Sequence, residues 1–293
     1  MDNLLREASD RATAYLHGLD GRSVFPSTST VSQLKQLDGE LPENLMDEEE
    51  VLVLLDEIGS PATVASAGGR YFGFVVGGSL PGALAANWLA SAWDQNAMSS
   101  VSSPVAAKIE EIVIPWLLEL LHLPEDCAGA LVTGAMMANF TALAAARHAV
   151  LKKHGWDVEA DGLAGSPPIT VVVSEQAHPT LLKAASLLGF GHKRLVRVPV
   201  DKQGRLQAAS LPTLSEQTIL CIQSGNVNTG AFGLWAAATP KRQYLTAGIA
   251  EADSWATDAH KWLNVPYDSG IAFVRDREAL VGDRVSGRHS GLN

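Results

Sequence analysis

Short apolar and β-branched runs alternate with longer segments of helical periodicity from about residue 129 onward. This alternation constrains the fold more than any other feature. Strands are predicted at residues 129–133, 169–174, 195–200, 218–223 and 271–275, and helices between them at 137–153 and 178–188. The run ITVVVS at 169–174 is typical of a strand buried on both faces. This order predicts an α/β sheet with right-handed crossovers.

The apolar spacing in residues 1–60 predicts a partly exposed helical arm, and residues 61–293 are predicted to form one large domain. Asp47 is expected to cap a helix with an acidic first turn. Ser103 and Pro104 predict the start of a long amphipathic helix, which Pro115 should kink. Residues 71–93 carry no charge, but their glycines and Pro81 favour a glycine loop followed by a buried helix over a membrane span.

Composition excludes several classes of protein. With 46% hydrophobic and 18% charged residues, the 293-residue chain is too apolar for a disordered protein. A net charge of −10 argues against nucleic-acid partners and anionic membranes. Two cysteines give no disulfide framework, and the N-terminus has no apolar signal sequence, so a reducing, cytoplasmic location is expected.

Several common functional signatures are absent from the sequence. It contains no G-x-G-x-x-G, P-loop, H-E-x-x-H or G-x-S-x-G motif. An unrelated α/β hydrolase is therefore disfavoured, because no nucleophile motif supports it. The two cysteines are too far apart for a zinc knuckle, and no metal site is predicted.

The most informative segment is SWATDAHKWLNVPYDSG at 254–270. Its lysine, Lys261, has Ala259, Trp262 and Leu263 as neighbours and follows Asp258 and His260. Burial favours the neutral form of an amine, and a neutral amine can attack an aldehyde to form a Schiff base. The local sequence equally allows a surface lysine whose stem lies on apolar neighbours, beside a structural histidine.

Three further groups follow strands at positions where α/β sheets bind ligands. Gly134, Ala135 and Met136 lie where a strand turns into a helix, and a helix N-terminus suits a phosphate. An ordinary tight turn is the alternative. His178 follows the 169–174 strand and is placed to contact a ligand, but its ring could equally form hydrogen bonds only to the local backbone. Asn228 and Thr229 follow the 218–223 strand, where G-N-V-N-T-G could also be a plain polar turn.

Five ordered blocks decide between these alternatives. They are YFGFVVGGSLPG, SSPVAAKIEEIVIPWL, LVTGAMMANFTALAAAR, SEQAHPTLLKA and TDAHKW. Together they resemble the group II pyridoxal-phosphate-dependent amino-acid decarboxylases, from about residue 24 to the end. The resemblance implies a fold-type I, aspartate-aminotransferase-like large domain with an N-terminal helical segment. It also implies a carboxy-lyase acting on an L-amino acid, and a homodimer.

The resemblance also assigns roles to individual residues. Lys261 would form a Schiff base with pyridoxal 5′-phosphate, and His178 would stack on the cofactor ring. Gly134, Ala135 and Met136 would hold the phosphate, although family members often have a hydroxyl residue near Met136. Asp258 and His260 would orient the lysine and contact the phosphate side, and Asn228 and Thr229 would reach the cofactor.

The sequence departs from the family pattern after residue 223. Gly230-Ala231-Phe232 runs directly into Gly233-Leu234-Trp235. In the family a helix and a strand intervene, and that strand ends in an aspartate that pairs with the pyridine nitrogen. The small C-terminal domain is also expected to be missing. An alternative is therefore a catalytically inactive family member that acts only in cofactor binding or subunit pairing.

Overall fold

The computed structural model describes residues 2–41, 43–225 and 233–281. By its internal contacts the chain divides into two compact units, Met1–Gly78 (unit 1) and the chain from Ser79 onward (unit 2). The sequence placed the end of the helical arm at residue 60, whereas unit 1 extends 18 residues further, through the glycine-containing loop.

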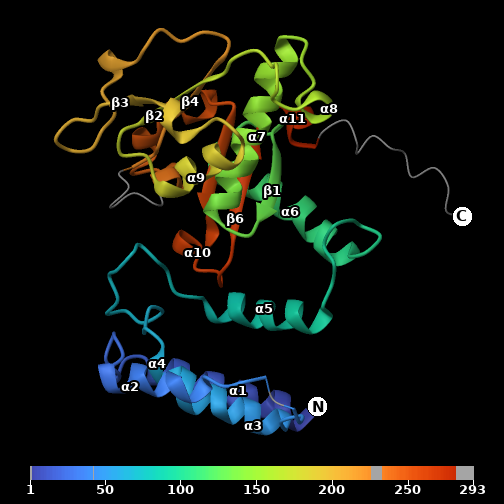
Figure 1. The fold of residues 1–293 in the computed structure, drawn as a ribbon, viewed down its shortest axis with the longest axis vertical. Coiled ribbons are helices and arrows are strands. Elements are labelled where there is room, and N and C mark those ends of the chain that lie inside the picture. Colours follow the sequence, from blue (N-terminus) through green and yellow to red (C-terminus); the bar gives the residue numbers. More distant parts are fainter. Residues whose placement is uncertain (1, 42, 226–232, 282–293) are drawn as a thin grey trace, which may run out of the picture. The chain divides into compact units, whose positions relative to one another are not determined.

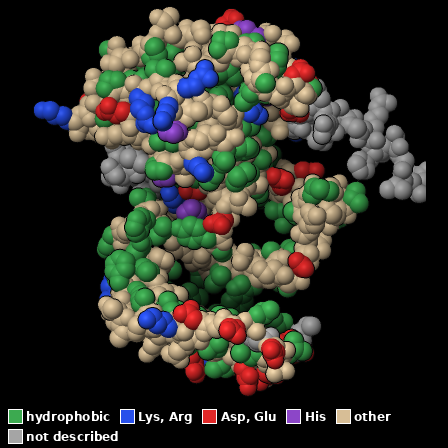
Figure 2. Space-filling model, viewed as in Figure 1, with side chains coloured by type: hydrophobic (Ala, Val, Ile, Leu, Met, Phe, Trp, Pro, Cys, Tyr) green, Lys and Arg blue, Asp and Glu red, His purple; other side chains and the backbone are tan. Residues whose placement is uncertain are grey.

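Unit 1 is helical. It contains α1 (Asp2–Gly18), α2 (Thr28–Gln33), α3 (Glu48–Leu54), α4 (Ser60–Ala62), a 3₁₀ turn (Leu34–Leu37) and a π-helical turn (Leu55–Gly59). Asp47 caps α3 as predicted, accepting from the backbone N–H of Glu49 at 2.8 Å. Acidic side chains gather over α1 and α3 (Figure 2).

Polar contacts hold unit 1 together. Among its described residues only Leu19 and Ala65 are buried apolar residues. Arg22 donates to the backbone carbonyls of Ser60, Pro61 and Thr63, which follow it by some forty residues. Such a small apolar core contributes little of the burial that stabilises a folded unit.

Unit 2 contains the remaining helices (Figure 1). The α-helices are α5 (Pro81–Trp93), α6 (Pro104–Leu120), α7 (Ala135–Lys153), α8 (Val158–Asp161), α9 (Pro179–Leu187), α10 (Ala259–Trp262) and α11 (Arg277–Val281). The 3₁₀ turns are His192–Arg194, Ala208–Ser210, Gly233–Ala238, Gln243–Thr246 and Ile249–Glu251. Ser103 is the N-cap of α6, and Pro115 lies within that helix, as predicted.

In the described part of unit 2, six strands form two sheets. They are β1 (Ala128–Val132), β2 (Thr170–Ser174), β3 (Val196–Val198), β4 (Thr218–Cys221), β5 (Ser254–Asp258) and β6 (Gly270–Val274). One sheet has the order β3-β2-β4 with parallel pairing, and the other has the order β1-β6-β5 with antiparallel pairing. The α/β class is confirmed, and the described strands fall into two separate three-stranded sheets.

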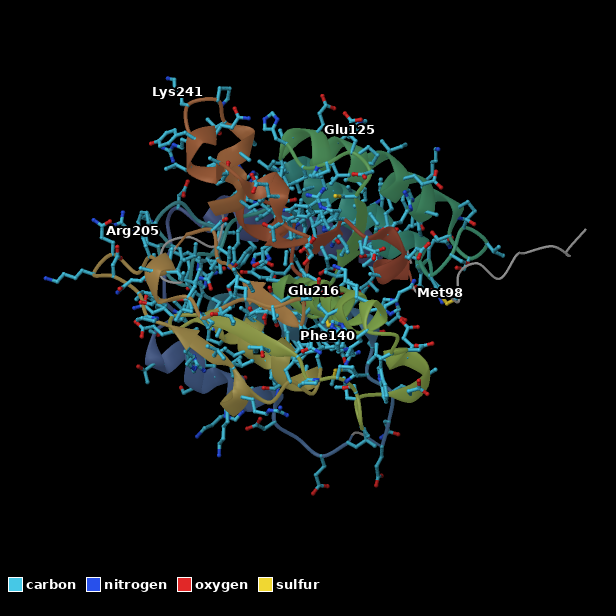
Figure 3. All side chains as sticks on the ribbon, turned by 90° about the horizontal axis from the view of Figure 1, so that it is seen from above. Met98, Glu125, Phe140, Arg205, Glu216 and Lys241 are labelled. Atoms are coloured by element: carbon cyan, nitrogen blue, oxygen red, sulfur yellow. The ribbon has the colours of Figure 1, made fainter. Side chains whose placement is uncertain are left out.

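Two main hydrophobic clusters form the core of unit 2. One joins α6 to the β1-β6-β5 sheet around Trp235 and Phe273, and the other joins α7 and α9 to β2 around Val173. Helix α7 contacts β5, β6 and, more sparsely, β4, so it covers strands of both sheets. Phe140 of α7 is partly buried and packs against the second cluster, whereas Arg205 and Lys241 project outward (Figure 3).

Helix α5 differs from its prediction, because none of its residues is buried. Its apolar composition predicted a buried helix, yet its Trp88, Leu89 and Trp93 side chains are between 41 and 55% exposed. Within the described residues, no helix combines the length and apolarity needed to cross a membrane.

Candidate functional site

The carboxyl ends of three strands bring the predicted site residues together. Gly134 follows β1, His178 follows β2, and Lys261 lies in α10, which begins directly after β5. The α10 segment is only one turn long and begins directly after β5. The pairing register of β5 with β6 therefore determines where the side chains of α10 lie. Asp258 pairs with Gly270 at the end of that ladder.

Asp258 connects the lysine to the start of α7. Its Oδ2 lies 3.2 Å from Lys261 Nζ, and its Oδ1 accepts from the backbone N–H of Ala135 at 2.8 Å. Asp258 is only 5% exposed, and the Lys261 side chain is 14% exposed. The Lys261 side chain is therefore largely enclosed, and its amine lies beside a carboxylate.

The turn between β1 and α7 has open space beside Gly134. Gly134 has a φ of +152°, and a Cβ built on it would meet nothing within 4 Å. The amides of Ala135, Met136 and the next residue lie in the first helical turn, where N–H groups have no intrahelical acceptor. On its other side the turn touches β6, because a Cβ on Gly270 would lie 2.4 Å from the Gly134 carbonyl carbon.

His178 is the N-cap of α9. Its Nδ1 accepts from the backbone N–H of Thr180 at 3.2 Å, and its own backbone N–H donates to Gln223 Oε1 at 3.0 Å. Because Nδ1 accepts, the neutral ring carries its proton on Nε2. Burial and the positive charge of Lys261 lower the pKa of His178, and Asp258 opposes this shift. The imidazole is thus electrostatically coupled to the lysine and its carboxylate.

His260 packs against an aromatic ring. Its centroid lies 4.0 Å from that of Tyr267, with the rings tilted by 31°. Its Nδ1 is 3.6 Å from Asp258 Oδ1, beyond a good hydrogen bond, and has no hydrogen-bond partner among the described residues. The buried imidazole therefore lies beside Asp258 without a good hydrogen bond to it.

The structure adds residues that the sequence did not single out. Thr180 Oγ1 lies 2.7 Å from His178 Nδ1 and accepts from Asn139 Nδ2 at 3.2 Å. Gln223, two residues past the end of β4, accepts from the His178 backbone N–H, and the Tyr267 ring packs against His260. Gln223 was recoverable from the sequence, because it ends a predicted strand beside Asn228 and Thr229. Those last two residues lie outside the described part of the chain.

A comparison with protein families finds one match. Residues 32–234 match the conserved domain of the pyridoxal-dependent decarboxylases. This range covers more than two thirds of the chain and stops at the second residue after the Gly-Ala-Phe junction. It includes Gly134 and His178 and ends before Lys261.

Curated relatives of similar sequence are decarboxylases. The aromatic-L-amino-acid decarboxylase of Bacillus atrophaeus is 26% identical over 311 residues, which cover 96% of this chain and 62% of that enzyme. The enzyme of the same description from Bos taurus is 25% identical over 329 residues, covering 97% of this chain and 67% of the relative. The chain thus spans roughly two thirds of the length of these relatives.

Solved structures share the fold. The crystal structure of mouse CSAD in apo form matches all of this chain and 67% of its own, with a TM-score of 0.84 and 20% identity. The crystal structure of Oryza sativa TDC with PLP and tryptamine matches with a TM-score of 0.83 and 22% identity, at the same coverage. These similarities confirm the expected α/β large-domain fold.

Proposed function

The chain belongs to the pyridoxal-dependent decarboxylase family, and from this premise we propose that it is built to release CO2 from an L-amino acid, with Lys261 as the residue that bonds pyridoxal 5′-phosphate. One observation carries the proposal. The Lys261 amine, the Asp258 carboxylate and the first amide of α7 form a continuous chain of contacts at 3.2 and 2.8 Å.

The residues present fit the cofactor. The open space beside Gly134 and the free amides of the first turn of α7 suit a phosphate. The Lys261 amine suits an aldehyde, and the half-buried His178 ring suits a flat aromatic partner. One feature works against the phosphate, because Asp258 already accepts from the Ala135 N–H. The phosphate would thus bind to the amides of Met136 and the residue after it.

Each side chain then has a role in the reaction. Asp258 holds the amine, and its charge balances the ammonium whenever Lys261 carries a proton. His178, neutral with its proton on Nε2, is held rigidly by Thr180 and offers a flat face. The bound cofactor supplies an electron-accepting ring that takes up the electron pair left when CO2 departs. The Lys261 amine could return a proton to the carbon that has lost its carboxylate.

An inactive cofactor-binding protein is the second candidate. Among the described residues, Asp258 is the carboxylate that the structure brings to the lysine, and it is already shared between Lys261 and Ala135. The aspartate expected to pair with the pyridine nitrogen belongs to the segment that follows Gly-Ala-Phe in the family and is absent here. Without that partner, the ring nitrogen loses its proton more readily and accepts electrons less well.

Two measurements test the proposal and separate the candidates. Purified protein is titrated with pyridoxal 5′-phosphate and its visible absorption is recorded, with Lys261→Ala as the variant and Lys183→Ala, on the exposed side of α9, as the control. A band that needs Lys261 but not Lys183 supports cofactor bonding, and its absence contradicts the proposal. Release of CO2 from a panel of L-amino acids supports the enzyme, whereas a bound but silent protein supports the second candidate.

We also propose that the chain forms a homodimer through α5 and α6. Both helices expose large apolar side chains: Trp88, Leu89 and Trp93 on α5, and Ile109 and Trp116 on α6, with Trp116 65% exposed. Apolar surface of this kind marks protein interfaces. Light scattering is expected to give twice the chain mass for the native protein and the single-chain mass for Trp116→Glu. A native monomer contradicts the proposal.

A further inference from the structure

We infer that Asn139 and Thr180 are positioning residues for the ring of His178. Their hydrogen bonds reserve Nδ1 of the ring as an acceptor, so that the imidazole stays neutral and carries its one ring proton on Nε2. For the use that the ring serves, the inference rests on the proposed function. The protonation state of the ring is a property of this chain alone and can be measured without a cofactor.

The Nδ1 atom of His178 has two neighbouring donor groups, both from Thr180. The Thr180 backbone N–H donates to Nδ1 at 3.2 Å, and the Thr180 hydroxyl oxygen lies 2.7 Å from it. A backbone N–H can only donate, so its bond requires a lone pair on Nδ1. A proton on Nδ1 would break this bond and remove the side-chain cap of α9, in which His178 takes the place of the usual Ser, Thr, Asp or Asn.

Asn139 determines the direction in which the Thr180 hydroxyl donates. Its Nδ2 donates to Thr180 Oγ1 at 3.2 Å, where helices α7 and α9 pack together. An amide NH2 group has hydrogens but no acceptor, so the hydroxyl hydrogen of Thr180 does not point toward it and is directed to Nδ1. The three groups therefore donate in one direction, from Asn139 to Thr180 and from Thr180 to the ring.

The charges around the ring favour the neutral imidazole but do not select its tautomer. The charged groups that act on it are Lys261 and Asp258, and burial and Lys261 lower the pKa of His178 by more than Asp258 raises it. The ring also lies at the N-terminus of α9, where a positive charge is unfavourable. Neither effect distinguishes a proton on Nδ1 from one on Nε2. That choice requires directional donors, which Thr180 and Asn139 supply.

Asn139 also links the ring to the turn proposed to hold the phosphate. It lies one helical turn after Ala135 on α7, and the Ala135 N–H donates to Asp258 Oδ1 at 2.8 Å. One helix thus carries both the proposed phosphate turn and the side chain that orients Thr180. With Nδ1 occupied, the Nε2–H group is the ring donor that remains for a ligand.

A purely structural role for the two side chains predicts a different result. If Asn139 and Thr180 only held α9 against α7, their replacement would lower the free energy of unfolding without changing the proton on the ring. As positioning residues they must change the protonation state of the ring itself. The measurement that separates the two roles is therefore the NMR signal of the ring nitrogens.

The first test is made on the full chain, labelled with 15N and without cofactor. The His178 signals are those that disappear in His178→Gln. At mildly alkaline pH we expect a protonated Nε2 and an unprotonated, hydrogen-bonded Nδ1. A native ring that carries its proton mainly on Nδ1 overturns the inference, and this result does not depend on the folding of any variant.

The second test titrates the ring in matched variants. Thr180→Val removes the hydroxyl and keeps the backbone N–H, so we expect the ring to bind its second proton about fivefold more tightly and to populate the Nδ1–H form. Asn139→Asp should act in the same direction, because a carboxylate accepts the hydroxyl hydrogen of Thr180. Thr180→Ser should behave as the native chain, as should Thr141→Val, the same substitution elsewhere on α7. A ring that titrates alike in Thr180→Val and Thr180→Ser overturns the inference.

A cofactor titration keeps this inference separate from the proposed function. We expect Thr180→Val to bind pyridoxal 5′-phosphate about two- to fivefold more weakly than Thr180→Ser, because apparent affinity falls with the fraction of chains in the competent state. Equal affinities would contradict the positioning role. If the native chain forms no band that depends on Lys261, the proposed function fails, and the NMR titration still decides the state of the ring.

Discussion

Replacing Asp258 by asparagine tests the contacts at the centre of the site. Asparagine keeps the size of the side chain and an oxygen for the Ala135 N–H, now at 2.8 Å. It removes the charge that lies 3.2 Å from Lys261 Nζ, and its amide N–H groups would face the ammonium. Removing one partner of a buried ion pair costs about 3–5 kcal/mol. Because Lys261 retains some exposure, we expect a loss of about 3 kcal/mol, the lower end of that range.

Urea unfolding at pH 7 measures this loss. With a denaturant dependence of about 3 kcal/mol per molar urea, the midpoint should fall by about 1 M. Asp253→Asn is the matched control, because Asp253 is exposed just before β5 and should change the free energy of unfolding by less than about 0.5 kcal/mol. If the two variants unfold at the same urea concentration, the Asp258–Lys261 contact does not stabilise the fold and our account of the site is wrong.

Two further predictions follow from the same region. The pKa of His178, followed by NMR of its ring protons, should lie below 6.5, rise in Lys261→Met and fall further in Asp258→Asn. Because folding lowers the pKa of His178, the neutral ring stabilises the folded state fully above pH 6.5, and this stabilisation is lost as the pH falls. A measured pKa of 6.5 or higher would contradict this prediction. Gly270→Ala should cost about 1–3 kcal/mol in urea unfolding, because its Cβ would strike the Gly134 backbone. Gly82→Ala is the control and should not lower the stability, because its Cβ meets nothing within 4 Å. Equal losses in the two variants would refute the close contact between Gly270 and the Gly134 backbone.

The sequence predicted the strands that have strong local signals. The apolar and β-branched runs predicted the bounds of β2, β4 and β6 to within two residues, and Ser103 predicted the start of α6. Strand β5 was missed, because SWATD mixes small and polar residues and its strand character arises from pairing with β6. The neighbours of each strand needed the structure, because strand order along the chain does not determine which strands pair in space.

The sequence predicted the site better where a motif fixed the local geometry. Lys261 and Asp258 lie within one helical turn of each other, so their contact follows from spacing. The contact between Asp258 and Ala135 joins residues 123 positions apart and needed the fold. The role of His178 as the cap of α9 could have been anticipated from Pro179 at the first helical position. The exposure of α5 could not have been anticipated, because apolar composition alone does not distinguish a core helix from an interface helix.

Chemical trapping at Lys261 tests the central claim most directly. The chain is incubated with pyridoxal 5′-phosphate, reduced with borohydride and digested, and the modified peptide is located by mass spectrometry. We expect one dominant pyridoxyl group, on Lys261 in the peptide that contains Asp258, and strong loss of labelling in Asp258→Asn. Labelling spread over exposed lysines such as Lys183 and Lys241, with Lys261 unmodified, would contradict the account.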